Sequence, residues 1–191
     1  MVSTNPMISL PFRRTSRSGN IDALYGMIVA QARSPEFYRG YGVPDTVDGR
    51  LDMIVLHLVL VLRQMKMANG ALPPAGQRLF DRFLQDMDGN FREMGVGDLA
   101  VPKRMQKVGE AFYGRAQVYE GALTESSPAT LEAAVARNVF GVPEPTLGAR
   151  RLATYMRDVA ARLSQQHADA LMAAKFEFTD PASVADGSLN V

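Results

Sequence analysis

Residues 51–67, LDMIVLHLVLVLRQMKM, contain the most apolar run of the chain. The first half of this stretch is apolar on nearly every face, which is typical of a helix surrounded by other helices. Val and Ile are also common in buried strands, but the stretch is much longer than the ~4–8 residues of such a strand. The apolar run is too short for the ~20 residues that a helix needs to cross a bilayer. We therefore expect a helix at the centre of the fold and no membrane span.

Amphipathic patterns on both sides of this stretch predict further helices, which Gly and Pro residues separate. Asn20 and Thr146 stand where helix caps are expected, and residues 35–49 are typical of a connector with one short turn. No segment shows the alternation of apolar and polar residues that is typical of a strand, except residues 176–178. The predicted helices cover residues 20–33, 51–67, 76–94, 102–119, 128–140 and the segment that follows Thr146.

These patterns predict an all-α fold, a single bundle-like domain of about six helices. We expect this domain to span residues 19–179, with flexible, disordered tails at residues 1–18 and 180–191.

The composition excludes several kinds of chemistry. The chain contains no Cys, which excludes disulfides and thiolate-based zinc, iron–sulfur or nucleophile chemistry. Its net charge of +1 is too small to hold it on nucleic acid by charge alone, so nucleic acid is not expected as a direct partner. Residues 86–90 resemble the start of a calcium loop, but Phe91 and Gly97 replace the glycine and the glutamate that such a loop needs. We find neither a phosphate-binding loop nor a serine elbow, and we expect no catalytic residue, metal or cofactor.

His57 lies within the apolar stretch, where a histidine can serve as a haem ligand or a proton shuttle. A buried side chain that is hydrogen-bonded to a backbone carbonyl is the commoner outcome. A haem-handling or redox protein that uses His57 is therefore kept as an alternative function.

The sign of the charge changes between residues 76–98, which are mainly acidic, and residues 99–115, which are mainly basic. Two oppositely charged helices joined by a short turn can pair with each other, or they can offer two faces to a partner. Met87, Met94 and Met105 lie near the same turn. Methionine usually fills gaps in a core, but its flexible side chain also adapts to varied apolar partners.

The N-terminal tail is basic, because Arg13, Arg14 and Arg17 are accompanied by no acidic residue. These three arginines are candidates for contact with an anionic membrane surface. A transit peptide and a plain disordered tail remain alternatives. A generic peripheral membrane-binding module that depends on these arginines is a second alternative function.

Two parts of the chain resemble the ubiquinol-cytochrome c chaperone family, and most closely its bacterial branch. The resemblance lies in residues 24–57 and 79–115, in the words LYG (24–26), IVAQAR (28–33), GVPDT (42–46), REMGVGDL (92–99), VPKRM (101–105) and AFYGR (111–115). It implies a non-enzymatic chaperone for assembly of the cytochrome bc1 complex, respiratory complex III, which binds cytochrome b or an early intermediate alongside a small companion protein. It also implies a cytoplasmic protein peripheral to the bacterial inner membrane, or one on the matrix side if the chain is mitochondrial.

We expect the client to bind the exposed part of residues 86–115. There, charges and adaptable apolar groups can meet the polar loops and helix ends of a membrane protein. The candidate client-binding residues are Asp86, Asp88, Arg92, Glu93, Met94, Asp98, Lys103, Arg104, Lys107 and Arg115.

Overall fold

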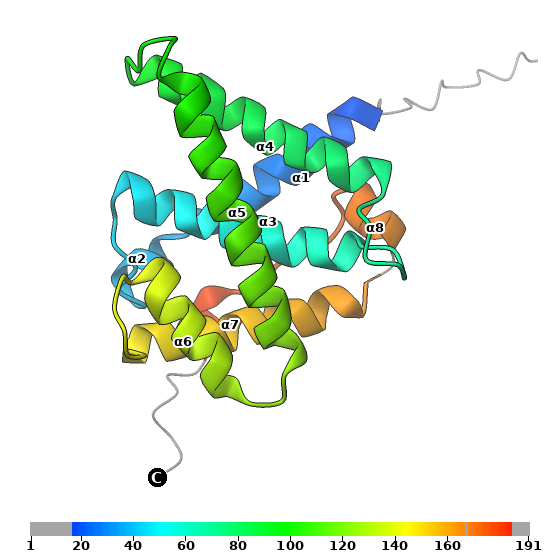
Figure 1. Cartoon of the computed structure of the whole chain (residues 1–191). Coiled ribbons are helices and arrows are strands. Elements are labelled where there is room, and N and C mark those ends of the chain that lie inside the picture. Colours follow the sequence, from blue (N-terminus) through cyan, green and yellow to red (C-terminus); the bar gives the residue numbers. More distant parts are fainter. Residues whose placement is uncertain (1–16, 167, 185–191) are drawn as a thin grey trace, which may run out of the picture.

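The structure is a computed structural model that describes residues 17–166 and 168–184 (Figure 1). Its helices are α1 (Arg17–Ala32), α2 (Pro35–Arg39), α3 (Val47–Met65), α4 (Pro74–Glu93), α5 (Val101–Thr124), α6 (Pro128–Val139), α7 (Leu147–Ser164), α8 (Ala168–Met172) and the 3-10 turn η1 (Pro181–Ser183). Apart from the short α2 and α8, six α-helices have 12 or more residues within these two ranges, where no strand occurs. The predicted all-α fold of about six helices is confirmed.

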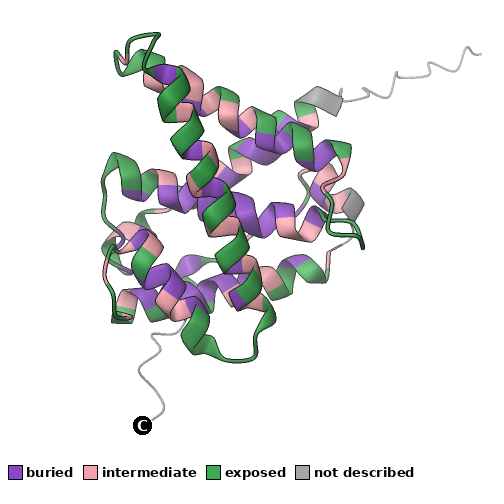
Figure 2. Cartoon of the chain, in the orientation of Figure 1, coloured by how far each residue is buried: buried purple, intermediate pink, exposed green. Residues whose placement is uncertain are grey.

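Helix α3 lies at the centre of the domain, as its apolar sequence predicts. Residues 52–62 are all buried, and α3 packs against α1, α5, α6 and α7 (Figure 2). The helix begins after Thr46, whose hydroxyl accepts a hydrogen bond from the Gly49 amide at 3.1 Å. This cap satisfies one of the free N–H groups of the first turn.

The remaining helices form pairs around α3. α6 and α7 pack together on one side of it, and α1 and α4 pack together on the other (Figure 1). Helix α5 crosses α3 and reaches α6. The last turns of α4 and the first turns of α5 form a hairpin that projects beyond the other helices, at the upper left of Figure 1.

Both predicted domain boundaries differ from the structure. α1 begins at Arg17, before the predicted cap Asn20, so the N-terminal tail does not extend to residue 18. The predicted C-terminal tail is wrong at residues 180–184. There the Asp180 side chain caps η1, and Pro181 and Val184 are buried. A segment this short shows no periodicity, so only its contacts assign it to the domain. The disorder predicted for residues 1–16 and 185–191 lies outside the described residues.

Candidate functional site

The charged turn predicted from the sequence is the tip of the α4–α5 hairpin, which we define as residues 94–100. Gly95 has a φ of +76°, a left-handed conformation that glycine adopts readily, and it lets the chain turn back after α4. The Gly95 amide donates a hydrogen bond to the Arg92 carbonyl at 3.0 Å, which closes the last turn. The candidate client residues therefore lie along both arms of a hairpin.

Three candidates form one surface cluster at the end of α4. The Arg92 guanidinium pairs with Asp88 at 2.7 Å and also with Asp98, and both carboxylates are exposed or half-buried. These hydrogen bonds and nearby charges raise the pKa of Arg92. Exposed ion pairs of this kind contribute little stability, about 0–1 kcal/mol each. The charges of Arg92, Asp88 and Asp98 are therefore paired with one another, but they are not covered by neighbouring helices.

The basic candidates on α5 are more accessible. Lys103, Arg104 and Lys107 are all exposed. The guanidinium of Arg104 lies 5.6 Å from the centre of the Phe91 ring, a cation–π distance. Lys103 and Lys107 have no ion pair with any part of the chain that the structure describes.

Two of the candidates, Asp86 and Arg115, make contacts within the fold. Asp86 faces α1, where it accepts a hydrogen bond from the Tyr25 hydroxyl at 2.9 Å. Arg115 reaches the buried Asp52 of α3 at 2.6 Å. Both residues come from faces of their helices that pack against a neighbouring helix.

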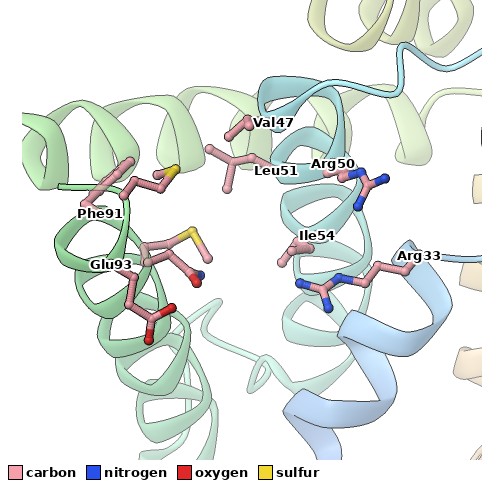
Figure 3. A pocket seen from close by; sticks show the side chains of 10 residues that line it. Arg33, Val47, Arg50, Leu51, Ile54, Phe91 and Glu93 are labelled. Carbon is pink, nitrogen blue, oxygen red and sulfur yellow. The ribbon is translucent and has the colours of Figure 1, made fainter. Parts of the chain in front are cut away.

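Glu93 and Met94 lie on a groove that the sequence alone did not reveal (Figure 3). The groove has a volume of about 290 Å³ and separates the first turns of α3 from the last turns of α4. Its lining residues are Arg33, Val47, Arg50, Leu51, Ile54, Met87, Asn90, Phe91, Glu93 and Met94. It forms because α4 packs mainly on α1 and α5, so its last turns stand away from α3.

The groove is apolar along its middle and charged at its edges. Val47 and Met94 line it while remaining 65% and 52% exposed. Arg33 and Arg50 lie on one side and Glu93 on the other (Figure 3). Large apolar side chains that stay exposed beside a hollow are typical of a binding surface.

The arginine edge continues into a second hollow of about 240 Å³, which Arg33, Tyr38, Arg39 and Arg50 help to line. Arg50 pairs with Asp45 at 2.6 Å, and this hydrogen bond lowers the pKa of Asp45. Arg33 and Arg39 are exposed and have no ion pair within the described ranges. One end of the groove is therefore cationic.

His57 has no free nitrogen, which contradicts the haem-handling alternative. Its Nδ1 lies 2.7 Å from the Met53 carbonyl, which can only accept, so Nδ1 carries the proton. Its Nε2 then accepts a hydrogen bond from the Tyr155 hydroxyl at 2.8 Å. Burial lowers the pKa of His57 to about 4, and the ring is fully buried. It cannot reach a ligand unless the core opens.

The candidates for membrane contact lie at or before the start of the described residues. Arg13 and Arg14 precede the described residues, and of Arg17 only the backbone, at the start of α1, is described.

Across residues 17–166 and 168–184, no group of three His, Asp or Glu side chains is arranged to hold a metal ion. None of the helices in these ranges combines the length and the apolar character that crossing a bilayer requires.

Sequence reasoning missed the α3 side of the groove. Val47 and Ile54 share it with Phe91 and Met94, which lie on a different helix. Helical periodicity reports which residues share a face of one helix, so it cannot show that two faces leave a gap between them. The resemblance to the chaperone family extends over both segments, in residues 24–57 and 79–115, but it does not show which of their residues meet.

The fold and the groove together define an all-helical domain with an open apolar surface between two of its helices. The model of the family described as ubiquinol-cytochrome C chaperone matches residues 39–178. The chain belongs to this family, since the match spans more than half of its length.

A solved structure is also similar over nearly the whole domain. It is the crystal structure of the Cbp3 homolog from Brucella abortus, with 37% sequence identity and a TM-score of 0.80. The similarity covers 91% of this chain and 97% of that chain. The comparison with curated proteins gives no match. The resemblance seen in residues 24–57 and 79–115 is thereby confirmed.

Proposed function

We propose that this protein is a non-enzymatic chaperone for assembly of the ubiquinol-cytochrome c reductase (bc1) complex, and that it holds cytochrome b or an early intermediate. Membership of the chaperone family supports the assembly role. The apolar groove between α3 and α4 is the observation that carries the binding role.

The groove suits part of a membrane-protein client. Such a client exposes apolar side chains and polar helix ends until its partners cover them. A volume of about 290 Å³ accommodates a few side chains rather than a whole helix. Arg33 and Arg39 favour a client segment with a carboxylate beside its apolar side chains, because charges at the rim orient a partner. Met94 and Met87 can adjust to different side-chain shapes.

The protein acts beside the membrane in this proposal, on the cytoplasmic face of a bacterial inner membrane. Its client is embedded there, and peripheral contact keeps the groove close to newly made chains. Contact with a small companion protein remains a prediction from the family resemblance.

A pair of matched double variants tests the groove. Val47 and Leu147 are both the first helical residue after a threonine cap, in α3 and α7, and they are 65% and 55% exposed. Val47→Asp with Met94→Asp places two charges in the groove. Leu147→Asp with Met67→Asp places two charges at exposed apolar positions elsewhere, since Met67 is 47% exposed.

We expect the groove variant to lower co-purification of cytochrome b by roughly tenfold, because apolar contacts at the centre of an interface dominate its affinity. Mature bc1 complex should fall in cells that carry it in place of the wild type. The variant with Leu147→Asp and Met67→Asp should retain both the capture of cytochrome b and the normal level of bc1 complex. Equal capture by the groove variant and the wild type would contradict the groove as the client site, and normal bc1 levels after deletion of the protein would contradict the assembly role.

A further inference from the structure

The hairpin tip carries the most exposed large apolar side chain among the described residues. Leu99 is 99% exposed, and it lies on a turn that projects beyond the rest of the domain (Figures 1 and 2). Neither the core nor the groove uses this residue. Single exposed Leu side chains are common on protein surfaces, but one at the end of a projecting turn can enter an apolar phase without any change in the fold.

Two exposed lysines follow Leu99 along the chain. Lys103 and Lys107 follow it at spacings of four residues, so the two lysines share one face of α5. Both are exposed and lack ion pairs within the described ranges. Of the nearby acids, Asp88 and Asp98 are held by Arg92, while Glu93 is exposed at the end of α4 and lines the groove.

From these observations we propose that the hairpin tip contacts an anionic lipid surface, with Leu99 entering the interface and Lys103 and Lys107 meeting the phosphate headgroups. The tip offers two exposed large apolar side chains, Leu99 and Met94, and Met94 lines the groove, whereas a stable protein interface buries about 800 Å² on each partner. A fluid lipid surface adapts to such a tip, and flexible lysines suit headgroups that have no fixed position. The inference rests on the peripheral location proposed above and names the part of the chain that makes the contact.

This contact also has a consequence for the groove. Met94 lines the groove and begins the tip, so a tip held at the membrane keeps the groove beside the lipid surface. A membrane-protein client then reaches the groove without leaving the vicinity of the bilayer.

Tryptophan fluorescence tests the contact directly, because the chain contains no Trp and one introduced Trp reports on its own position. We expect the emission of Leu99→Trp to shift to shorter wavelength when full-length protein is mixed with vesicles of phosphatidylcholine and phosphatidylglycerol. Leu147→Trp, at the exposed start of α7, should show no shift. Vesicle binding without a shift at Leu99→Trp would place the membrane contact elsewhere, and absence of vesicle binding would also overturn the proposal.

Co-sedimentation with the same vesicles tests the charges. Lys103→Gln with Lys107→Gln should lower binding by about tenfold and weaken its dependence on salt. Arg33→Gln with Arg39→Gln, which removes two exposed charges elsewhere, should leave vesicle binding unchanged.

Capture of cytochrome b in detergent solution separates this proposal from the groove. The lysine variant should keep that capture while Val47→Asp with Met94→Asp loses it. If the lysine variant loses client capture and keeps vesicle binding, the basic face of α5 contacts the client and the lipid proposal is wrong.

Discussion

Asp52 and Arg115 form an ion pair in the interior, where a charge is expensive to bury. The carboxylate of Asp52 lies 2.6 Å from the Arg115 guanidinium and joins α3 to α5. Burial raises the pKa of Asp52 to about 6, although Arg115 opposes this effect and Asp48 adds to it. Loss of hydration therefore outweighs the attraction between the two charges.

The raised pKa predicts a specific dependence of stability on pH. Between pH ~4 and ~6 the folded state takes up a proton on Asp52 that the unfolded state, with an ordinary pKa, does not. The contribution of this group to stability therefore grows as the pH falls through 6 and is lost as the pH rises. We expect the free energy of unfolding of the wild type, relative to Asp52→Asn, to increase by about 1–3 kcal/mol from pH ~7 to pH ~4.5 in urea titrations.

Asp45 is the matched control for this measurement. It is exposed, and its pKa is lowered by the hydrogen bond from Arg50. Its contribution is therefore present above the unfolded pKa and is lost on acidification, the opposite sign. A wild type that gains no stability relative to Asp52→Asn as the pH falls would contradict the account of Asp52.

A close backbone contact lies between the start of helix α7 and the loop after α2. A Cβ atom on Gly148, the second residue of α7, would lie 1.9 Å from the Tyr41 carbonyl oxygen and 3.2 Å from the Phe140 ring. Tyr41 belongs to the loop after α2, so α7 and this loop can approach only because residue 148 has no side chain. Gly121 on α5, by contrast, has no neighbouring atom within 4 Å of such a Cβ.

These two glycines predict opposite effects of the same substitution. Gly148→Ala should destabilise the protein by about 1–3 kcal/mol, because a backbone oxygen cannot move aside without shifting its segment. Gly121→Ala should leave stability unchanged or raise it by up to about 1 kcal/mol, since alanine favours the helix more than glycine. Thermal unfolding of both variants checks the pair, and equal melting temperatures would show that the contact at residue 148 is not tight.

The C-terminal segment, residues 175–184, closes the domain by crossing between helices. Phe176 and Val184 are buried, and the Phe178 ring lies 5.4 Å from that of His57. The Gln31 amide donates hydrogen bonds to the Thr179 carbonyl and to the Tyr155 hydroxyl, each at 3.0 Å. Residues 175–184 thereby extend the hydrogen-bond network that links Gln31, Tyr155 and His57.

Truncation measures the contribution of the end of this segment. Removal of residues 180–191 deletes buried Pro181 and Val184, and it leaves the Tyr41 hydroxyl without the Pro181 carbonyl that accepts its hydrogen bond at 2.7 Å. We expect it to lower the free energy of unfolding by about 2–4 kcal/mol more than removal of residues 185–191 alone. Equal stability of the two truncations would show that residues 180–184 contribute nothing to the domain.

Local patterns predicted most of the architecture. Apolar periodicity indicated the all-α class, and the apolar run after residue 51 indicated the central position of α3. Thr146 was predicted as a helix cap, and its hydroxyl accepts a hydrogen bond from the Ala149 amide at 3.1 Å. Patterns of this kind are readable because each depends on residues within a few turns of one helix. The family resemblance was readable for the same reason, since it consists of short words.

The functional surface depends on which helices meet. Asp86 and Arg115 were candidates for client contact, but Asp86 accepts a hydrogen bond from Tyr25, 61 residues away in sequence, and Arg115 pairs with Asp52 of another helix. Val47 and Met94 looked unrelated, yet they line one groove because α4 packs on α1 and α5 and leaves α3 open there. A sequence pattern shows which side of each helix is apolar, while the packing of all the helices determines which apolar side chains remain uncovered.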